Sequence, residues 1–395
     1  MPVNLIDIMK RIERYGAQVG ERYSNIAARQ VKVADLIAAY ADRLEELTAR
    51  FNRAAEVIPR LRCAVPTGEP LDSAIPMPDL PDRYTLLASD GSQINPSRHT
   101  RVPFCVINVS VLKMVCGSGE APQVHTESQF LDYDSLFLPE GGMVSEGMVA
   151  LRRDLWERQA LMEWAGDLEH PAFAMIDGPL ELIREPRESS GFSRFMDQYL
   201  ATLSQCKQEN LVLLGYIDKS QSDLISRLLE LVALHDAELE QYHQTPRRFL
   251  GVKDISFLSD LLVNPGERSA IFAIHSQSAQ LFRDDLALHF FYLNVGREGK
   301  PHLARVEIPK WVASDQELVG TLQAVLTAQA GILGTRPYPY LLHRAHEEAI
   351  VPISEHQHVE KMIVAELERR GIPVEEGSNK QYHKDLPAGK TRYQG

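Results

Sequence analysis

The sequence predicts an α/β fold with a mixed sheet, in which an antiparallel meander is followed by parallel strands, flanked by helices and preceded by an N-terminal helical arm. Residues 4–58 are rich in helix-forming types and contain no proline. A short apolar run at 84–90 and two stretches rich in β-branched residues follow, which together suggest a three-stranded antiparallel meander. From residue 171 onward, short apolar runs alternate with helical spacing, which is typical of strands joined by crossover helices.

The N-terminal part predicts two long helices, because between residues 4 and 58 glycine occurs only at Gly16 and Gly20. Five prolines between residues 65 and 83 indicate an extended linker. The last twenty residues are polar and indicate a loose tail. The predicted organisation is a helical arm at 1–60, a linker at 61–83, one α/β domain at 84–375 and a tail at 376–395.

The first strand of the domain is expected at 84–90, where an apolar run stops at Asp90 and Gly91. Further strands are expected at 102–115, 124–133, 171–177, 211–217, 269–275, 286–294 and 302–308. Helices are expected at 143–168, 190–207, 222–234, 315–329 and 354–370.

Composition restricts the classes of protein. The formal net charge of −12 argues against a protein that coats nucleic acid non-specifically, although a local basic channel is compatible with it. Residues 1–14 carry charges where a signal peptide needs an apolar core, and no apolar run is long enough to span a membrane. Four scattered cysteines fit a reducing compartment and are interpreted as packing residues. We therefore expect a cytoplasmic protein without a membrane segment. The chain also has no P-loop sequence.

One pattern occurs at two distant places: an apolar strand that ends in Asp-Gly, at Asp90 and at Asp177. An aspartate at the end of a buried strand is partly desolvated and requires a cation or hydrogen-bond donors. If the two strands are neighbours, the carboxylates converge, and like charges at that distance are tolerated when a metal neutralises them. The alternative is that each aspartate only caps a turn, since Asp-Gly is an ordinary turn former.

Five segments in order resemble motifs of the NurA nuclease family, over roughly residues 80–365. They are Ser89-Asp90-Gly91-Ser92, Met175-Ile176-Asp177-Gly178-Pro179-Leu180, Tyr216-Ile217-Asp218-Lys219-Ser220, Arg305-Val306-Glu307-Ile308-Pro309, and Tyr338-Pro339-Tyr340-Leu341-Leu342 with Ala345-His346-Glu347. The resemblance implies an RNase H-like core and a manganese-dependent nuclease that acts on DNA ends. It also implies a homodimer that works with a HerA-type hexameric ATPase in double-strand break repair.

The resemblance places the family's metal-binding aspartates on Asp90 and Asp177. The family's helix-borne glutamate falls on Glu157, with Glu163 as the second choice, and the two lie on different faces of the helix. For Glu157 the alternative is a solvated ion pair with Arg153, four residues earlier.

The family's C-terminal tyrosine and histidine fall on Tyr338 and His346. An imidazole can bind a second metal ion or position the phosphate, and a phenol can donate to a phosphate oxygen. The alternatives are a loop aromatic and a capping or core histidine. Lys219 is assigned to substrate binding, or otherwise is a solvated lysine at a helix start. The histidines of 354–358 are interpreted as surface residues.

The predicted function is a metal-dependent DNA nuclease that uses Mn²⁺ or Mg²⁺, a 5′-to-3′ exonuclease with or without single-strand endonuclease activity, processing DNA ends with a HerA-type ATPase. The main alternative is a catalytically silent RNase H-like scaffold that docks a partner ATPase. An Asp-x-Asp hydrolase is disfavoured, because Ser92 and Pro179 stand two residues after the two aspartates.

Overall fold

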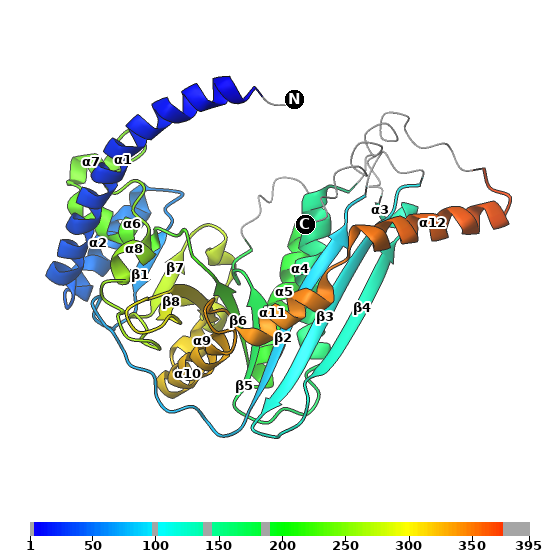
Figure 1. The fold of residues 1–395 in the computed structure, drawn as a ribbon. Coiled ribbons are helices and arrows are strands. Elements are labelled where there is room, and N and C mark those ends of the chain that lie inside the picture. The colour runs from blue at the N-terminus through cyan, green and yellow to red at the C-terminus, as the bar shows by residue number, and fades with distance from the viewer. Residues whose placement is uncertain (1–3, 97–101, 137–143, 183–189, 374–395) are drawn as a thin grey trace. The chain divides into compact units, whose positions relative to one another are not determined.

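The computed structural model describes residues 4–96, 102–136, 144–182 and 190–373, which pack as two compact units (Figure 1). The first unit consists of Met1–Asp82, Asp177–Ile183 and Val212–Tyr340, and the second of Arg83–Ile176, Arg184–Leu211 and Leu341–Gly395. Each unit is therefore assembled from segments distant in sequence. The division into arm, linker, domain and tail stays a prediction, and the tail at 376–395 lies outside the described residues.

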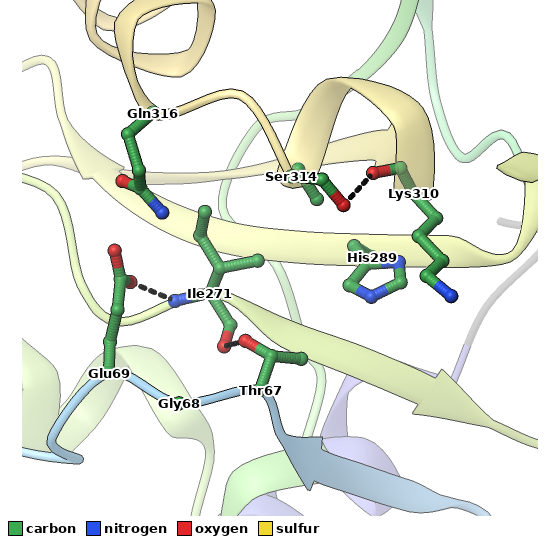
Figure 2. A pocket seen from close by; sticks show the side chains of 9 residues that line it. Thr67, Gly68, Glu69, Ile271, His289, Lys310, Ser314 and Gln316 are labelled. Atoms are coloured by element: carbon green, nitrogen blue, oxygen red, sulfur yellow. Dashed lines mark hydrogen bonds between the residues drawn. The ribbon is translucent and has the colours of Figure 1, made fainter.

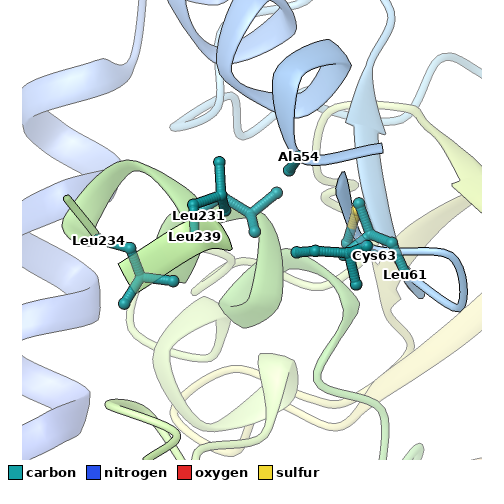
Figure 3. Packing of buried hydrophobic residues seen from close by; sticks show 7 residues of the cluster. Ala54, Leu61, Cys63, Leu231, Leu234 and Leu239 are labelled. Carbon is teal, nitrogen blue, oxygen red and sulfur yellow. The ribbon is translucent and has the colours of Figure 1, made fainter. Parts of the chain in front are cut away.

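Two long helices open the first unit, α1 (Leu5–Tyr40) and α2 (Leu44–Val57), as the sequence predicts. Figure 3 shows how α2 is attached: its apolar side and the chain after it pack against α6 (Leu224–Ala233) and α7 (Asp236–Glu240). The buried cluster consists of Ala54, Ile58, Leu61, Cys63, Leu231, Leu234 and Leu239. Burial of this apolar surface holds the second helix on the unit.

The strands of the first unit are hydrogen-bonded in the order β1-β7-β8-β9-β6. Their bounds are Cys63–Pro66, Phe272–His275, Leu288–Asn294, Leu303–Pro309 and Leu211–Ile217. Neighbouring strands in this order pair antiparallel. Strand β1 falls inside the predicted linker. It tolerates the neighbouring prolines because it is at the edge of this order, with Pro66 at its last position.

Helices and turns complete the first unit around these strands. The helices after α7 are α8 (Asp254–Leu258), α9 (Lys310–Ala313) and α10 (Gln316–Ile332), with short 3₁₀ helices at Ala279–Leu281 and Asp284–Leu286. Strands β8 and β9 are buried at every position, including Arg305 and Glu307 of β9.

The second unit carries the strands β5-β2-β3-β4. Strand β2 (Tyr84–Ile94) pairs antiparallel with β3 (Cys105–Cys116), which pairs antiparallel with β4 (Gln123–Leu131), so the predicted meander is confirmed. Strand β5 (Ala172–Asp177) pairs parallel with β2. The helices are α3 (Tyr133–Leu136), α4 (Glu146–Glu163), α5 (Ser190–Gln208), α11 (Tyr340–Ala349) and α12 (Ile353–Arg369).

One strand differs from the expectation in a way that matters for function. The sequence predicts that the strand ends at Asp90, but β2 continues to Ile94, paired with β3 throughout. The reason is that β3 is long enough to provide backbone partners past Asp90, so Gly91 adopts strand geometry instead of starting a turn. On its other side, β2 pairs with β5 only as far as Ser89, whose partner is Ile176. Asp90 is therefore the first residue of β2 beyond this pairing.

Both units thus belong to an α/β protein with mixed strand directions and flanking helices. The four cysteines carry free thiols, three of them buried, in agreement with packing roles. Among the described residues, no helix has the length and apolarity needed to cross a bilayer.

Candidate functional site

Asp90 lies in the second unit, where the parallel ladder between β2 and β5 stops. That ladder ends at the pair Ser89–Ile176. Asp177, the next residue of β5, belongs to the first unit. The convergence of Asp90 and Asp177 stays a prediction.

The carboxylate of Asp90 is partly buried, with 19% of its side chain exposed. It forms hydrogen bonds with Gly91 and His346. Its Oδ1 accepts from the backbone N–H of Gly91 at 2.8 Å. Its Oδ2 lies 2.6 Å from Nδ1 of His346, which is carried by α11. Since an ionised carboxylate only accepts, Nδ1 donates the proton, and Nε2 of a neutral ring keeps its lone pair.

Helix α4 brings Glu157 to the same strand. A Cβ atom on Gly91 would lie 2.7 Å from Oε1 of Glu157 and 2.8 Å from Cγ of Arg153. The absence of a side chain at Gly91 therefore lets two long side chains of α4 approach the strand beside Asp90. Glu163, the second choice from sequence, is exposed.

The ion pair between Glu157 and Arg153 is present, with Oε1 3.0 Å from Nε, but it lies in a buried environment and not on a solvated face. The two groups are not oriented to form a hydrogen bond with each other. Neither Oε1 of Glu157 nor Nε of Arg153 has a hydrogen-bond partner among the described residues. Burial raises the pKa of Glu157 to about 8, opposed by Arg158 and Arg153, while the negative charges of Asp154 and Asp90 raise it further. Oε1 of Glu157 is thus a buried carboxyl oxygen that accepts no hydrogen bond from the described residues.

Asp177 ends β5 and is exposed, unlike the five buried residues before it. The chain turns immediately after it, since Gly178 has a φ of 112°, a conformation that favours glycine. The N–H of Gly178 donates to the carbonyl of Tyr216 at 2.8 Å. The negative charge of Asp177 helps raise the pKa of Tyr216, after burial and Asp218.

Tyr338 and Lys219 lie in the first unit, on the segment Val212–Tyr340. The ring of Tyr338 packs edge-on against that of Tyr216 in β6, with ring centroids 5.6 Å apart. Tyr338 is therefore a loop residue whose ring is packed against a strand. Lys219 follows β6, is exposed, and has a φ of 45° that bulky side chains rarely adopt. The structure therefore gathers Asp90, Glu157 and His346 within the second unit, and Tyr338 beside Tyr216 in the first.

Three residues that matter to this arrangement did not stand out as site residues in the sequence. Arg153 was considered only as the partner of a solvated ion pair. Gly215 interrupts the apolar run of β6, and an isolated glycine in a strand is a signal of close backbone approach. Glu307 is a charged residue at a fully buried position of β9, a signal that such a residue has buried partners.

A cavity of about 470 Å³ in the first unit is separate from these residues (Figure 2). Most of its polar side chains are used internally: Thr67 donates to the carbonyl of Ile271, Glu69 accepts from the N–H of Ile271, and Ser314 donates to the carbonyl of Lys310. Glu69 is also paired with Arg268 at 2.8 Å. None of the residues predicted from sequence lines this cavity.

The donor types near Asp90 fit a divalent cation. Mg²⁺ prefers carboxylate oxygens, and Mn²⁺ accepts carboxylates together with imidazole. The buried Oε1 of Glu157, which accepts no hydrogen bond from the described residues, is the observation that fits a bound cation. Over the same described ranges, no three His, Cys, Asp or Glu side chains are already gathered as a metal-binding group. Hydrogen bonding to His346 and pairing with Arg153 occupy two of the carboxylates instead.

Asp90, the buried Glu157 and His346 thus lie together in one unit of an α/β protein. The family model for the NurA domain matches residues 84–351. The chain belongs to the NurA family, which confirms the resemblance seen in the sequence.

Solved structures similar to this chain include nucleases. The crystal structure of the NurA nuclease from Sulfolobus solfataricus matches with 12% identity and a TM-score of 0.48, covering 89% of this chain and 98% of that one. The catalytic domain of human endonuclease V matches with 14% identity and a TM-score of 0.31, covering 81% of this chain and 98% of the other. No protein with a curated function matches the sequence.

Proposed function

We propose that this NurA-family protein is a metal-dependent DNA nuclease with an RNase H-like core. The observation that carries the proposal is the grouping in the second unit: Asp90 lies 2.6 Å from His346, and the buried Glu157 packs against the neighbouring Gly91. The proposed metal ligands are Asp90, Asp177, Glu157 and His346. A Mn²⁺ or Mg²⁺ ion held by them would supply Lewis acidity for in-line hydrolysis of a phosphodiester.

The chain's own side chains have distinct proposed roles. The buried Oε1 of Glu157, which accepts no hydrogen bond from the described residues, would help to hold the cation. His346 fixes the orientation of the Asp90 carboxylate through Nδ1 and keeps Nε2 for a ligand or for the proton of a water molecule. Tyr338 and Lys219 would donate to phosphate oxygens. In the proposal, the cation would take the place of Arg153 as the charge partner of Glu157.

The partners belong to the same proposal. The protein would digest DNA ends in the 5′-to-3′ direction during double-strand break repair, as a homodimer working with a HerA-type hexameric ATPase. These features rest on membership of the NurA family. Light scattering of the purified chain, and its co-purification with such an ATPase, test them directly.

The test of the activity is cleavage of end-labelled linear duplex DNA with Mn²⁺, Mg²⁺ or a chelator. We expect Asp90→Asn and Asp177→Asn each to reduce the rate at least about 1,000-fold, since each removes a ligand charge from the reacting centre. Asp315→Asn is the matched control, because Asp315 caps α10 and asparagine caps a helix equally well. Full activity in either site variant, or cleavage unaffected by chelator, would exclude the proposal.

A catalytically silent scaffold that docks an ATPase is the second candidate. It is favoured by the Arg153–Glu157 ion pair, which already neutralises the glutamate without a metal ion. Titration calorimetry with Mn²⁺ separates the two candidates, because a degraded site takes up no ion. Arg153→Gln should strengthen Mn²⁺ binding if the arginine competes with the cation for Glu157, and should change nothing in a scaffold.

A further inference from the structure

The turn that follows Asp177 lies directly on strand β6. The N–H of Gly178 donates to the carbonyl of Tyr216. A Cβ atom on Gly215 would lie 2.5 Å from the carbonyl oxygen of Gly178 and 2.9 Å from the nitrogen of Leu180. Backbone atoms cannot move aside as side-chain ends can, so the turn takes this course because residue 215 is a glycine.

Glu307 on β9 is the cross-strand partner of Gly215. Paired residues of an antiparallel ladder point to the same face, so the missing side chain of Gly215 leaves space for that of Glu307. The Oε2 atom of Glu307 accepts from the N–H of Leu180 at 2.8 Å and from the N–H of Glu181 at 3.3 Å. One buried carboxylate therefore binds two successive N–H groups of the turn.

The charge of Glu307 is balanced within the same unit. Its Oε1 atom accepts from Nη2 of Arg305, two residues earlier, at 2.6 Å. Glu307 is fully buried and Arg305 is 6% exposed, so water does not screen these contacts. The far end of the turn is fixed separately, because Arg62 forms two hydrogen bonds to the carboxylate of Glu181.

We propose that Glu307 is a positioning residue for Asp177: by holding the N–H groups of Leu180 and Glu181, it fixes the turn and thereby the direction of the Asp177 carboxylate. This inference rests on the proposed function, in which Asp177 is a metal ligand. Glu307 touches neither substrate nor metal in this account. It acts through three residues of backbone, with Gly215 providing the space.

The substitution that tests this role is Glu307→Gln. Glutamine keeps the size of the side chain but replaces one acceptor oxygen with an NH₂ group, which must face either the N–H groups of the turn or the guanidinium of Arg305. The matched control is Glu230→Gln. Glu230 is also buried in the first unit, is paired with Arg247 and accepts from the N–H of Phe249 at 3.1 Å, but it does not touch the turn.

Three measurements are made on the full chain: Mn²⁺ affinity by calorimetry, kcat and KM on linear duplex DNA, and hydrogen exchange of the amides of residues 178–181. For Glu307→Gln we expect at least about tenfold weaker Mn²⁺ binding, a lower kcat with little change in KM, and at least about tenfold faster exchange in the turn. Glu230→Gln should lose thermal stability to a similar extent and change none of the three. In an Asp177→Asn background, Glu307→Gln should weaken Mn²⁺ binding no further, because the carboxylate that it positions is gone.

The outcomes separate this inference from the proposed function. If the unsubstituted protein binds Mn²⁺ and cleaves DNA while Glu307→Gln matches it in both, the positioning role is overturned and the function stands. Equal losses in Glu307→Gln and Glu230→Gln reduce Glu307 to a stability residue and also overturn the inference. If the unsubstituted protein neither binds Mn²⁺ nor cleaves DNA, the proposed function fails, and the positioning role fails with it whatever the exchange rates show.

Discussion

Gly91 is the residue at which helix α4 meets the strand that carries Asp90. In the sequence it looks like a turn former, but in the structure it is a strand residue whose missing side chain makes room for Glu157 and Arg153. Gly215 is also a strand residue whose missing side chain makes room for another segment, in this case the turn that follows Asp177. The two glycines could be recognised from sequence as special, but what fills the space could not, because it comes from segments distant in the chain.

Gly91→Ala should therefore affect the site more than the fold. The new Cβ lies within 3 Å of the end of Glu157 and of Cγ of Arg153, so both side chains must move away from Asp90. We expect a loss of about 1–3 kcal/mol in the free energy of unfolding. Mn²⁺ affinity should fall at least about tenfold, since a displaced Glu157 no longer faces Asp90. Calorimetry and urea unfolding measure the two effects.

The control for this substitution is Gly147→Ala in the same helix, where a Cβ would meet only Ser145 Oγ at 3.7 Å. Alanine is a better helix former than glycine, so this variant should be as stable as the parent or more stable by up to about 1 kcal/mol. Its Mn²⁺ affinity should not change. Unaltered Mn²⁺ binding by Gly91→Ala would show that Glu157 does not face the ion.

At the scale of elements, the sequence predicts those whose pattern is local. The long helices α1 and α2, the meander β2-β3-β4 and the run from α5 to α6 have strong periodicity, and all are found. Strand β1 was missed because its backbone partners are in β7, about 200 residues later, while the surrounding prolines indicate an extended chain. Helix α11 was missed because Pro337 and Pro339 precede it directly, although proline is acceptable at a helix start.

The candidate site shows the same limit. Asp90 and Asp177 stand out in the sequence because each ends an apolar run, and the resemblance to NurA proteins added Glu157 and His346. The contact between His346 and Asp90 joins residues 256 positions apart, and no local pattern announces it. Likewise, the anchoring of the turn by Glu307 depends on the register of β6 with β9, which sequence periodicity does not fix.

Asp254 joins three elements and should make stability depend on pH. It begins α8, accepts from two N–H groups in the first turn of α6, and accepts from the hydroxyl of Tyr292 on β8 at 3.0 Å. Burial raises the pKa of Asp254 to about 7, against 3.8 as the reference value, despite these hydrogen bonds. Between those two pH values the folded protein keeps a proton that the unfolded chain releases, so the free energy of unfolding falls as pH rises.

Over that window the contribution of Asp254 should decrease by a few kcal/mol, about 4 at most. The Asp254→Asn variant does not titrate there, so the free energy of unfolding of the parent minus that of the variant should fall between pH 4 and pH 7 and level off above it. Urea unfolding at half-unit steps of pH measures this difference, in which the titrations of other groups cancel. Parallel profiles for the two proteins would show that Asp254 stays ionised when folded.

On the scale of the whole molecule, residues 4–16 at the start of the described chain are all exposed. The second half of α1 is packed, with Val33, Ile37 and Ala41 buried, and Arg29 donates to the carbonyl of Leu250. Before that point, several large apolar side chains with helical spacing are exposed: Leu5, Ile8, Met9, Ile12 and Tyr15. A strip of this kind on one helix face is typical of a surface that packs against another helix.

Removal of residues 1–16 should therefore leave the fold intact and change the association of the chain. The described part of this segment, residues 4–16, is exposed, so we expect the free energy of unfolding to change by less than about 1 kcal/mol. If the proposed homodimer forms through this strip, light scattering should report a dimer for the full chain and a monomer for the shortened one. Replacing Ile8 and Ile12 together by Lys should have the same effect without shortening the helix, because charged ends cannot pack in an apolar seam. A shortened chain that remains dimeric would place the interface elsewhere, and a monomeric full chain would remove the dimer from the proposed function while leaving its metal site untouched.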